Sequence, residues 1–107
     1  MAESAEAPIA IERVQIGARM EKRLVKVLRA LADYHDMSLG DLLEGIVLHV
    51  FEHRLPFGEE GLQRIAQLKA VYGVDYGVEA SHHFIEPGQP EHLRHIARPE
   101  SEREESR

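Results

Sequence analysis

The spacing of apolar residues changes abruptly at one point, and this change constrains the fold more than any other feature. Residues 13–20, "RVQIGARM", alternate between polar and apolar side chains, which is the period of a half-buried strand. From Glu21 onward the apolar residues recur every three or four positions, which predicts a helix. A solitary strand leaves its backbone N–H and C=O groups unpaired. The sequence therefore predicts a strand that a second copy of the chain must complete.

Two amphipathic helices are expected directly after this strand. The first ends near "DYHDM", where Asp36 is suited to the left-handed conformation that closes a helix. Ser38 is expected to cap the second helix. The apolar stripe of that helix, expected to face the core, consists of Leu39, Leu42, Leu43, Ile46, Val47, Val50 and Phe51. That helix should end before Pro56, because proline disfavours helix at the preceding residue.

A third helix is predicted over residues 59–72, closed by Gly73. The next segment, "VDYGVEASHHFIE", fits either a short strand or a loop. Short connections keep consecutive helices adjacent, so we expect the third helix to pack on its own molecule and extend the core. The alternative is that residues 59–86 bind a partner protein.

The positive charge of the chain is concentrated in one block. The 107 residues carry a net charge of −6, yet residues 13–29 contain six basic residues and one acid. This block coincides with the expected strand and the first helix.

The expected strand and the two helices that follow it span about 45 residues, which bury too little surface to fold alone. We therefore expect two strands to pair antiparallel about a two-fold axis above four helices, with an outward face that fits the DNA major groove.

Residues 12–54 resemble the ribbon-helix-helix family of Arc/MetJ/CopG-type DNA-binding proteins. The matching segments are "RVQIGARM", "EKRLVKVLRALADYH" and "DMS" followed by "LGDLLEGIVLHVF". The resemblance implies a mostly α homodimer with an intersubunit antiparallel two-stranded β-ribbon, here with an extra C-terminal helix. It also implies a transcriptional regulator that reads double-stranded DNA with the ribbon.

The resemblance assigns candidate DNA-binding residues to three places. The groove-facing strand positions correspond to Gln15, Gly17 and Arg19, and Arg13 continues that face, although Gly17 supplies no side chain. The start of the second helix corresponds to the phosphate-anchoring site of the family, at Ser38, Leu39 and Gly40. Non-specific attraction to the DNA backbone is expected from Lys22, Arg23 and Lys26.

Four regions are expected along the chain. They are a flexible acidic arm (1–11), the ribbon-helix-helix domain (12–55), a C-terminal helical extension (56–86) and a disordered charged tail (87–107). The competing interpretation of function is an antitoxin-like or purely structural dimerisation module that binds a protein and no specific DNA.

Enzymatic activity is not expected, because no glycine-rich phosphate loop, nucleophile elbow or cysteine is present. His49 and His53 match H-x-x-E-H, a zinc-peptidase order, and offer a weak metal-binding alternative. A second possibility is metal binding through His82, His83, His92 and His95. We expect surface histidines instead, with no metal and no cofactor. No signal peptide or membrane span is recognisable, so a cytoplasmic location is expected.

Overall fold

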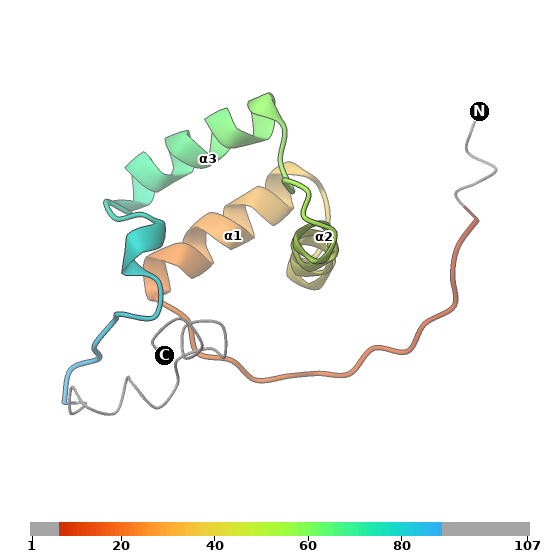
Figure 1. Ribbon diagram of the computed structural model, residues 1–107, viewed down its shortest axis with the longest axis horizontal. Helices are drawn as coiled ribbons and strands as arrows, with labels where there is room; N and C mark the ends of the chain where they lie inside the picture. The colour runs from red at the N-terminus through yellow and green to blue at the C-terminus, as the bar shows by residue number, and fades with distance from the viewer. Residues whose placement is uncertain (1–6, 89–107) are drawn as a thin grey trace.

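The computed structural model describes residues 7–88 of the chain, and in this part it is mostly helical. Three α-helices follow one another: α1 (Lys22–Tyr34), α2 (Leu39–Phe51) and α3 (Glu59–Tyr72). A short 3-10 helix, η2 (Val78–Ala80), comes after them. Figure 1 shows α1 and α3 side by side and running in opposite directions, with α2 crossing at the far end of α1.

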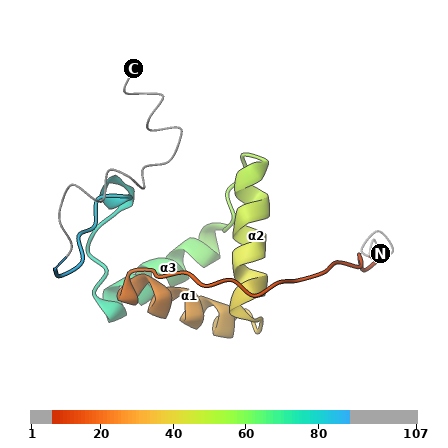
Figure 2. The same ribbon diagram turned by 90° about the horizontal axis from the view of Figure 1, so that it is seen from below.

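α1 is the central element of the described chain. It contacts both α2 and α3, whereas α2 and α3 do not contact each other within residues 7–88. The second view agrees, because α2 stands across the end of the α1–α3 pair (Figure 2). The core consequently lies on the two covered faces of α1 and is small. Its buried members are Val27, Leu31, Ala32, Leu42 and Val74.

The ends of the helices match local signals in the sequence. Ser38 Oγ accepts a hydrogen bond from the Asp41 N–H at 3.1 Å, so the predicted cap of α2 is confirmed. Asp36 has φ 60°, and Gly73 has φ 76° at the end of α3, as expected for left-handed residues that terminate helices. α1 begins after Glu21, whose carboxylate accepts a hydrogen bond from the Arg23 N–H.

The predicted strand is wrong. Residues 7–20 follow an extended path outside the helices (Figure 1) with no regular secondary structure, and no backbone hydrogen bond joins them to any described residue. Val14 and Ile16, expected to face a core, are 81% and 78% exposed. A strand requires a neighbouring extended segment to accept and donate its backbone hydrogen bonds. No such segment lies beside residues 7–20 in the described chain.

The expected fold class is corrected accordingly. The described residues form a helical unit with an extended N-terminal arm, and they contain no strand and no intersubunit antiparallel β-ribbon of the ribbon-helix-helix type. The segment after α3 forms η2 and a loop, which excludes the short strand considered for it. Residues 1–6 of the expected acidic arm and 89–107 of the expected tail lie outside the described residues.

The small core predicts that a single truncation at α1 is costly. Leu31 is 2% exposed and belongs to the core cluster, so Leu31→Ala should lower the free energy of unfolding by about 2–5 kcal/mol through the loss of buried apolar contacts. Val71→Ala is the control, since Val71 is 72% exposed and its truncation should change stability by less than about 0.5 kcal/mol. Urea unfolding followed by circular dichroism measures both. Equal effects of the two changes would contradict the assignment of the core.

Candidate nucleic-acid interface

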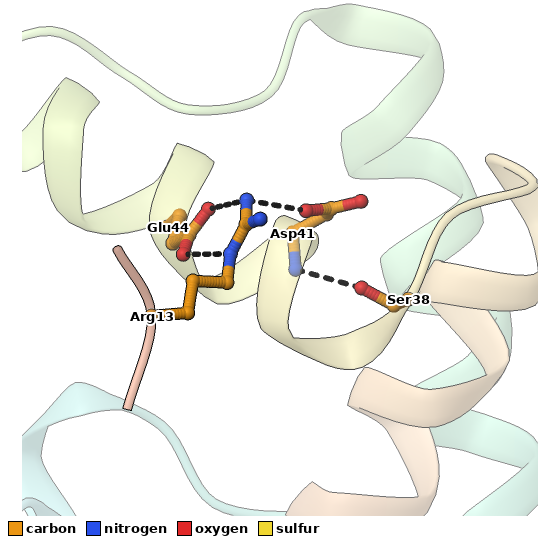
Figure 3. A network of polar contacts seen from close by, with 4 residues as sticks. All are labelled: Arg13, Ser38, Asp41 and Glu44. Atoms are coloured by element: carbon orange, nitrogen blue, oxygen red, sulfur yellow. Dashed lines mark hydrogen bonds and ion pairs between the residues drawn. The ribbon is translucent and has the colours of Figure 1, made fainter. Parts of the chain in front are cut away.

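Arg13, the first of the predicted base-reading residues, lies against the first turns of α2. Its Nε and Nη2 atoms donate to the two carboxylate oxygens of Glu44 at 2.9 and 2.8 Å (Figure 3). Nη2 also donates to Asp41 Oδ1 at 3.2 Å. The hydrogen bond and charge of Glu44 raise the pKa of Arg13, and the same hydrogen bond lowers the pKa of Glu44. Two carboxylates of its own chain therefore hold this guanidinium.

The predicted phosphate site at the start of α2 has an unexpected electrostatic setting. The amides of Leu39 and Gly40 belong to the first turn, where backbone N–H groups have no acceptor inside the helix. The Ser38 hydroxyl oxygen already accepts a hydrogen bond from the Asp41 N–H, and the Asp41 carboxylate lies in the same turn (Figure 3). An anion approaching this turn would meet the Asp41 carboxylate as well as the Arg13 guanidinium that partly neutralises it.

The other arm residues lie on the surface. Arg19 forms an exposed ion pair with Glu86, which brings the segment after η2 to the base of the arm. Gln15 is exposed, and Gly17 is in an open place where an added Cβ would meet nothing within 4 Å. Packing therefore does not require glycine at position 17.

Arg23 has a structural role rather than the expected place on a free DNA-facing surface. Its Nη1 donates to the Gly73 carbonyl at 2.7 Å, and its Nε donates to Glu21 at 3.1 Å. The Tyr76 hydroxyl also donates to Glu21. Hydrogen bonds from Tyr76 and Arg23 lower the pKa of Glu21 to about 2, and burial together with Glu21 raises the pKa of Tyr76 to about 12. These contacts attach the segment after α3 to the start of α1.

The exposed basic surface of α1 is formed by Lys22, Lys26 and Arg29. These residues recur at positions i, i+4 and i+7, so they share one face of the helix. The ion pairs between described residues involve Arg13, Arg19 and Arg23 and none of these three. Lys26 Nζ lies 5.9 Å from the centre of the Tyr72 ring, and no contact of this kind involves Lys22 or Arg29 among the described residues. This row is therefore available to an anionic partner.

A second surface, on the outer side of α2, is apolar. Leu42 on the inner side is buried, whereas Val47, Leu48, Val50 and Phe51 are all exposed. A helix that is apolar on both sides normally has both sides covered. Sequence reasoning assigned Val47, Val50 and Phe51 to the core stripe. The exposed Leu48, outside that stripe, is the signal that α2 is apolar over more than one face.

The histidine pair does not have the geometry of a helical metal site. α2 ends at Phe51, and His53 lies beyond it with φ 61°. The two rings therefore do not lie on one face of a helix, as two metal ligands at this spacing would. His49 Nδ1 lies 2.7 Å from the Gly45 carbonyl oxygen. Among residues 7–88 no group of three or more potential ligands is placed to hold a metal ion.

Comparisons with known proteins assign the chain to no family. No family model, curated protein or solved structure matches it. Within the described residues, none of the helices has the length and apolar character required to cross a membrane.

Two contacts at this interface were missed from the sequence: the Arg13 clamp and the Tyr76–Glu21 pair. Asp41 and Glu44 are three residues apart on a predicted helix, which places both carboxylates on one side and indicates a cation site. No comparable signal exists for Tyr76 and Glu21, because 55 residues separate them and only the fold of α3 brings them together.

The Tyr76–Glu21 contact predicts a specific loss of stability in acid. A carboxyl group with a lowered pKa in the folded state stabilises fully above its unfolded value, here 4.5, and loses this contribution as the pH falls toward about 2. Tyr76→Phe removes the main cause of the lowered pKa, so this variant should lose less stability than the unaltered chain between pH 4.5 and 2. Urea unfolding across this range measures the difference.

Tyr34→Phe is the matched control for that experiment. It removes another tyrosine–glutamate hydrogen bond, the exposed contact from Tyr34 to Glu60 at 3.0 Å, and leaves Glu21 untouched. It should retain the pH dependence of the unaltered chain. Parallel pH profiles for Tyr76→Phe and the unaltered chain would contradict the role assigned to Tyr76.

Proposed function

We propose that the protein is a homodimeric DNA-binding transcriptional regulator. The observation that carries this proposal is the row of exposed cations on α1, Lys22, Lys26 and Arg29, which continues from the basic arm. Duplex DNA presents about one negative charge per 1.7 Å of helix axis, so a row of free cations on one face gains from lying along it. Acidic residues predominate in the rest of the chain, which directs DNA toward this surface.

The arm can contribute once its arginines exchange partners. The Arg13 and Arg19 ion pairs are exposed, and ion pairs in water contribute little stability because solvent screens them. A phosphate or a guanine edge offers a guanidinium equivalent two-bond geometry. DNA therefore competes with Glu44 and Glu86 on nearly equal terms. Gln15, which lies between these two arginines in the sequence, is exposed as well.

The proposed dimer uses the outer face of α2 and does not require paired strands. The exposed apolar surface consists of Val47, Leu48, Val50 and Phe51. Its exposure to water is unfavourable, and a second copy can cover it with the same surface about a two-fold axis. Two copies would double the number of cations presented to the duplex.

A partner-binding module without specific DNA binding is the second candidate. It is favoured by the carboxylates that hold Arg13, because they occupy the side chain best suited to reading bases. In that case the apolar face of α2 would serve assembly, or an antitoxin-like contact with another protein. The DNA-binding proposal additionally requires the cytoplasmic location expected from the sequence.

The proposal predicts salt-dependent DNA binding that depends on the α1 row. Binding of duplex DNA should weaken steeply as salt rises, and Lys22→Ala/Arg29→Ala should reduce the slope of log K against log salt by about 0.9 for each phosphate that the variant leaves unneutralised. Gel-shift titrations at several salt concentrations measure both quantities. Absence of binding at low ionic strength would remove the DNA-binding proposal.

A charge-matched control separates this interface from net charge. Arg54→Ala, compared with the single change Arg29→Ala, removes one exposed cation outside the basic block and should bind DNA nearly as well as the unaltered chain. In the same assay, Asp41→Asn/Glu44→Gln releases Arg13 and should bind more tightly than Glu52→Gln/Glu59→Gln, which removes two acids elsewhere. Equal binding by these two variants would exclude a contribution of Arg13.

The dimer predicts that a charge on the outer face of α2 is disruptive. Val50→Asp should convert the protein to a monomer, because a buried carboxylate without a partner opposes association. Val71→Asp is the matched control: it places the same charge at an exposed valine of α3 and should leave the dimer intact. Light scattering after size-exclusion chromatography measures the mass. A monomeric unaltered chain would contradict the proposed assembly.

A further inference from the structure

A cavity of about 460 Å³ lies between α1, α3 and the segment that follows α3. Leu24 and Leu28 of α1 form one wall, and Ile65 of α3 forms the opposite one. The core residues Leu31 and Val74 lie at its base. Its volume falls within the range of about 300–1,000 Å³ that is usual for small-molecule sites.

The third wall is held in place by contacts already described. Tyr76 and Phe84 pack edge to face with ring centres 5.2 Å apart, and both line the cavity. The Tyr76 hydroxyl is bound to Glu21, and the Val74 N–H donates to the Lys69 carbonyl at 2.8 Å. The wall is therefore formed without a ligand, which lowers the cost of binding one.

The lining indicates an apolar ligand body. Most of the surface exposed in the cavity belongs to aliphatic and aromatic side chains, and the Tyr76 hydroxyl is already used by Glu21. Sugars and nucleotides require several hydrogen-bonding groups from their site, and this lining does not offer them. Hydrocarbon gains affinity here simply by leaving water.

One side chain of the lining is charged, and its charge determines which chemical group the polar end of the ligand should carry. Lys69, in the last turn of α3, is the only ionisable acid or base other than Tyr76 among the residues that line the cavity. It takes part in none of the ion pairs between described residues. A lysine stem lies along apolar surface and keeps its ammonium at the edge, so an anionic group is favoured at the rim.

We infer that this cavity binds a medium-chain fatty acid, with the carboxylate at Lys69 and the hydrocarbon chain between α1 and α3. One cation matches one carboxylate, and the apolar space between two helices that run side by side matches an unbranched chain. This site is separate from the exposed cation row of α1, and its occupancy does not depend on whether the protein binds DNA.

Calorimetric titration of the full chain tests the inference, with decanoate and octanoate below the concentrations at which they form micelles and with 1-decanol below its solubility limit. Decanoate should bind one molecule per chain. Each buried methylene contributes about fourfold in affinity, so decanoate should bind about 15-fold more tightly than octanoate. Lys69→Met, which keeps an apolar stem, should weaken decanoate binding about tenfold and leave 1-decanol binding unchanged.

Arg54→Met is the matched control, because Arg54 is an exposed cation outside the lining. It should bind decanoate as the unaltered chain does. Methyl chemical shifts of Leu24 and Leu28 should move on addition of decanoate, which locates the ligand. Absence of binding, binding of many molecules per chain, equal weakening by Arg54→Met, or unchanged binding by Lys69→Met would overturn the inference.

Discussion

The packing of α1 on two sides supports every other part of the structure. α2 and α3 contact α1 and not each other within residues 7–88, so each depends on one face of this helix. Such an arrangement buries few side chains, and Leu31 and Leu42 are among only five apolar residues buried in the described chain. The surfaces that remain uncovered are correspondingly large, and they include the outer side of α2 and the arm. The proposed assembly follows from this shortage of internal contacts.

Charge is organised around the same helix. The start of α1 is joined by Glu21 and Arg23 to the segment after α3, while Lys22, Lys26 and Arg29 remain exposed. The arm adds Arg13, but the acids of α2 hold it. One cationic surface is thus exposed and forms no ion pair within residues 7–88, and another is neutralised by acids of the same chain. A DNA-binding function rests on the first and on exchange of partners at the second.

Local signals predicted the helical part of the fold well. The Ser38 cap, the left-handed Asp36 and the closing Gly73 involve residues within a few positions of one another, so their geometry follows from short-range hydrogen bonds and φ preferences. The strand at 13–20 was wrong, because alternation shows which side chains are apolar but supplies no partner for the backbone. The candidate arginines were found from the sequence, and the acids that hold them were not.

The sequence by itself determined where the helices begin and end and where positive charge is concentrated, since both depend on neighbouring residues. The tertiary structure alone decided which of those charges are free. Arg23 meets the Gly73 carbonyl, Arg13 meets Glu44 and Tyr76 meets Glu21 only after α1 has packed against α2 and α3. Hydrogen bonds and ion pairs act over a few ångströms, so contacts between residues 31 to 55 positions apart form only when the fold brings them together.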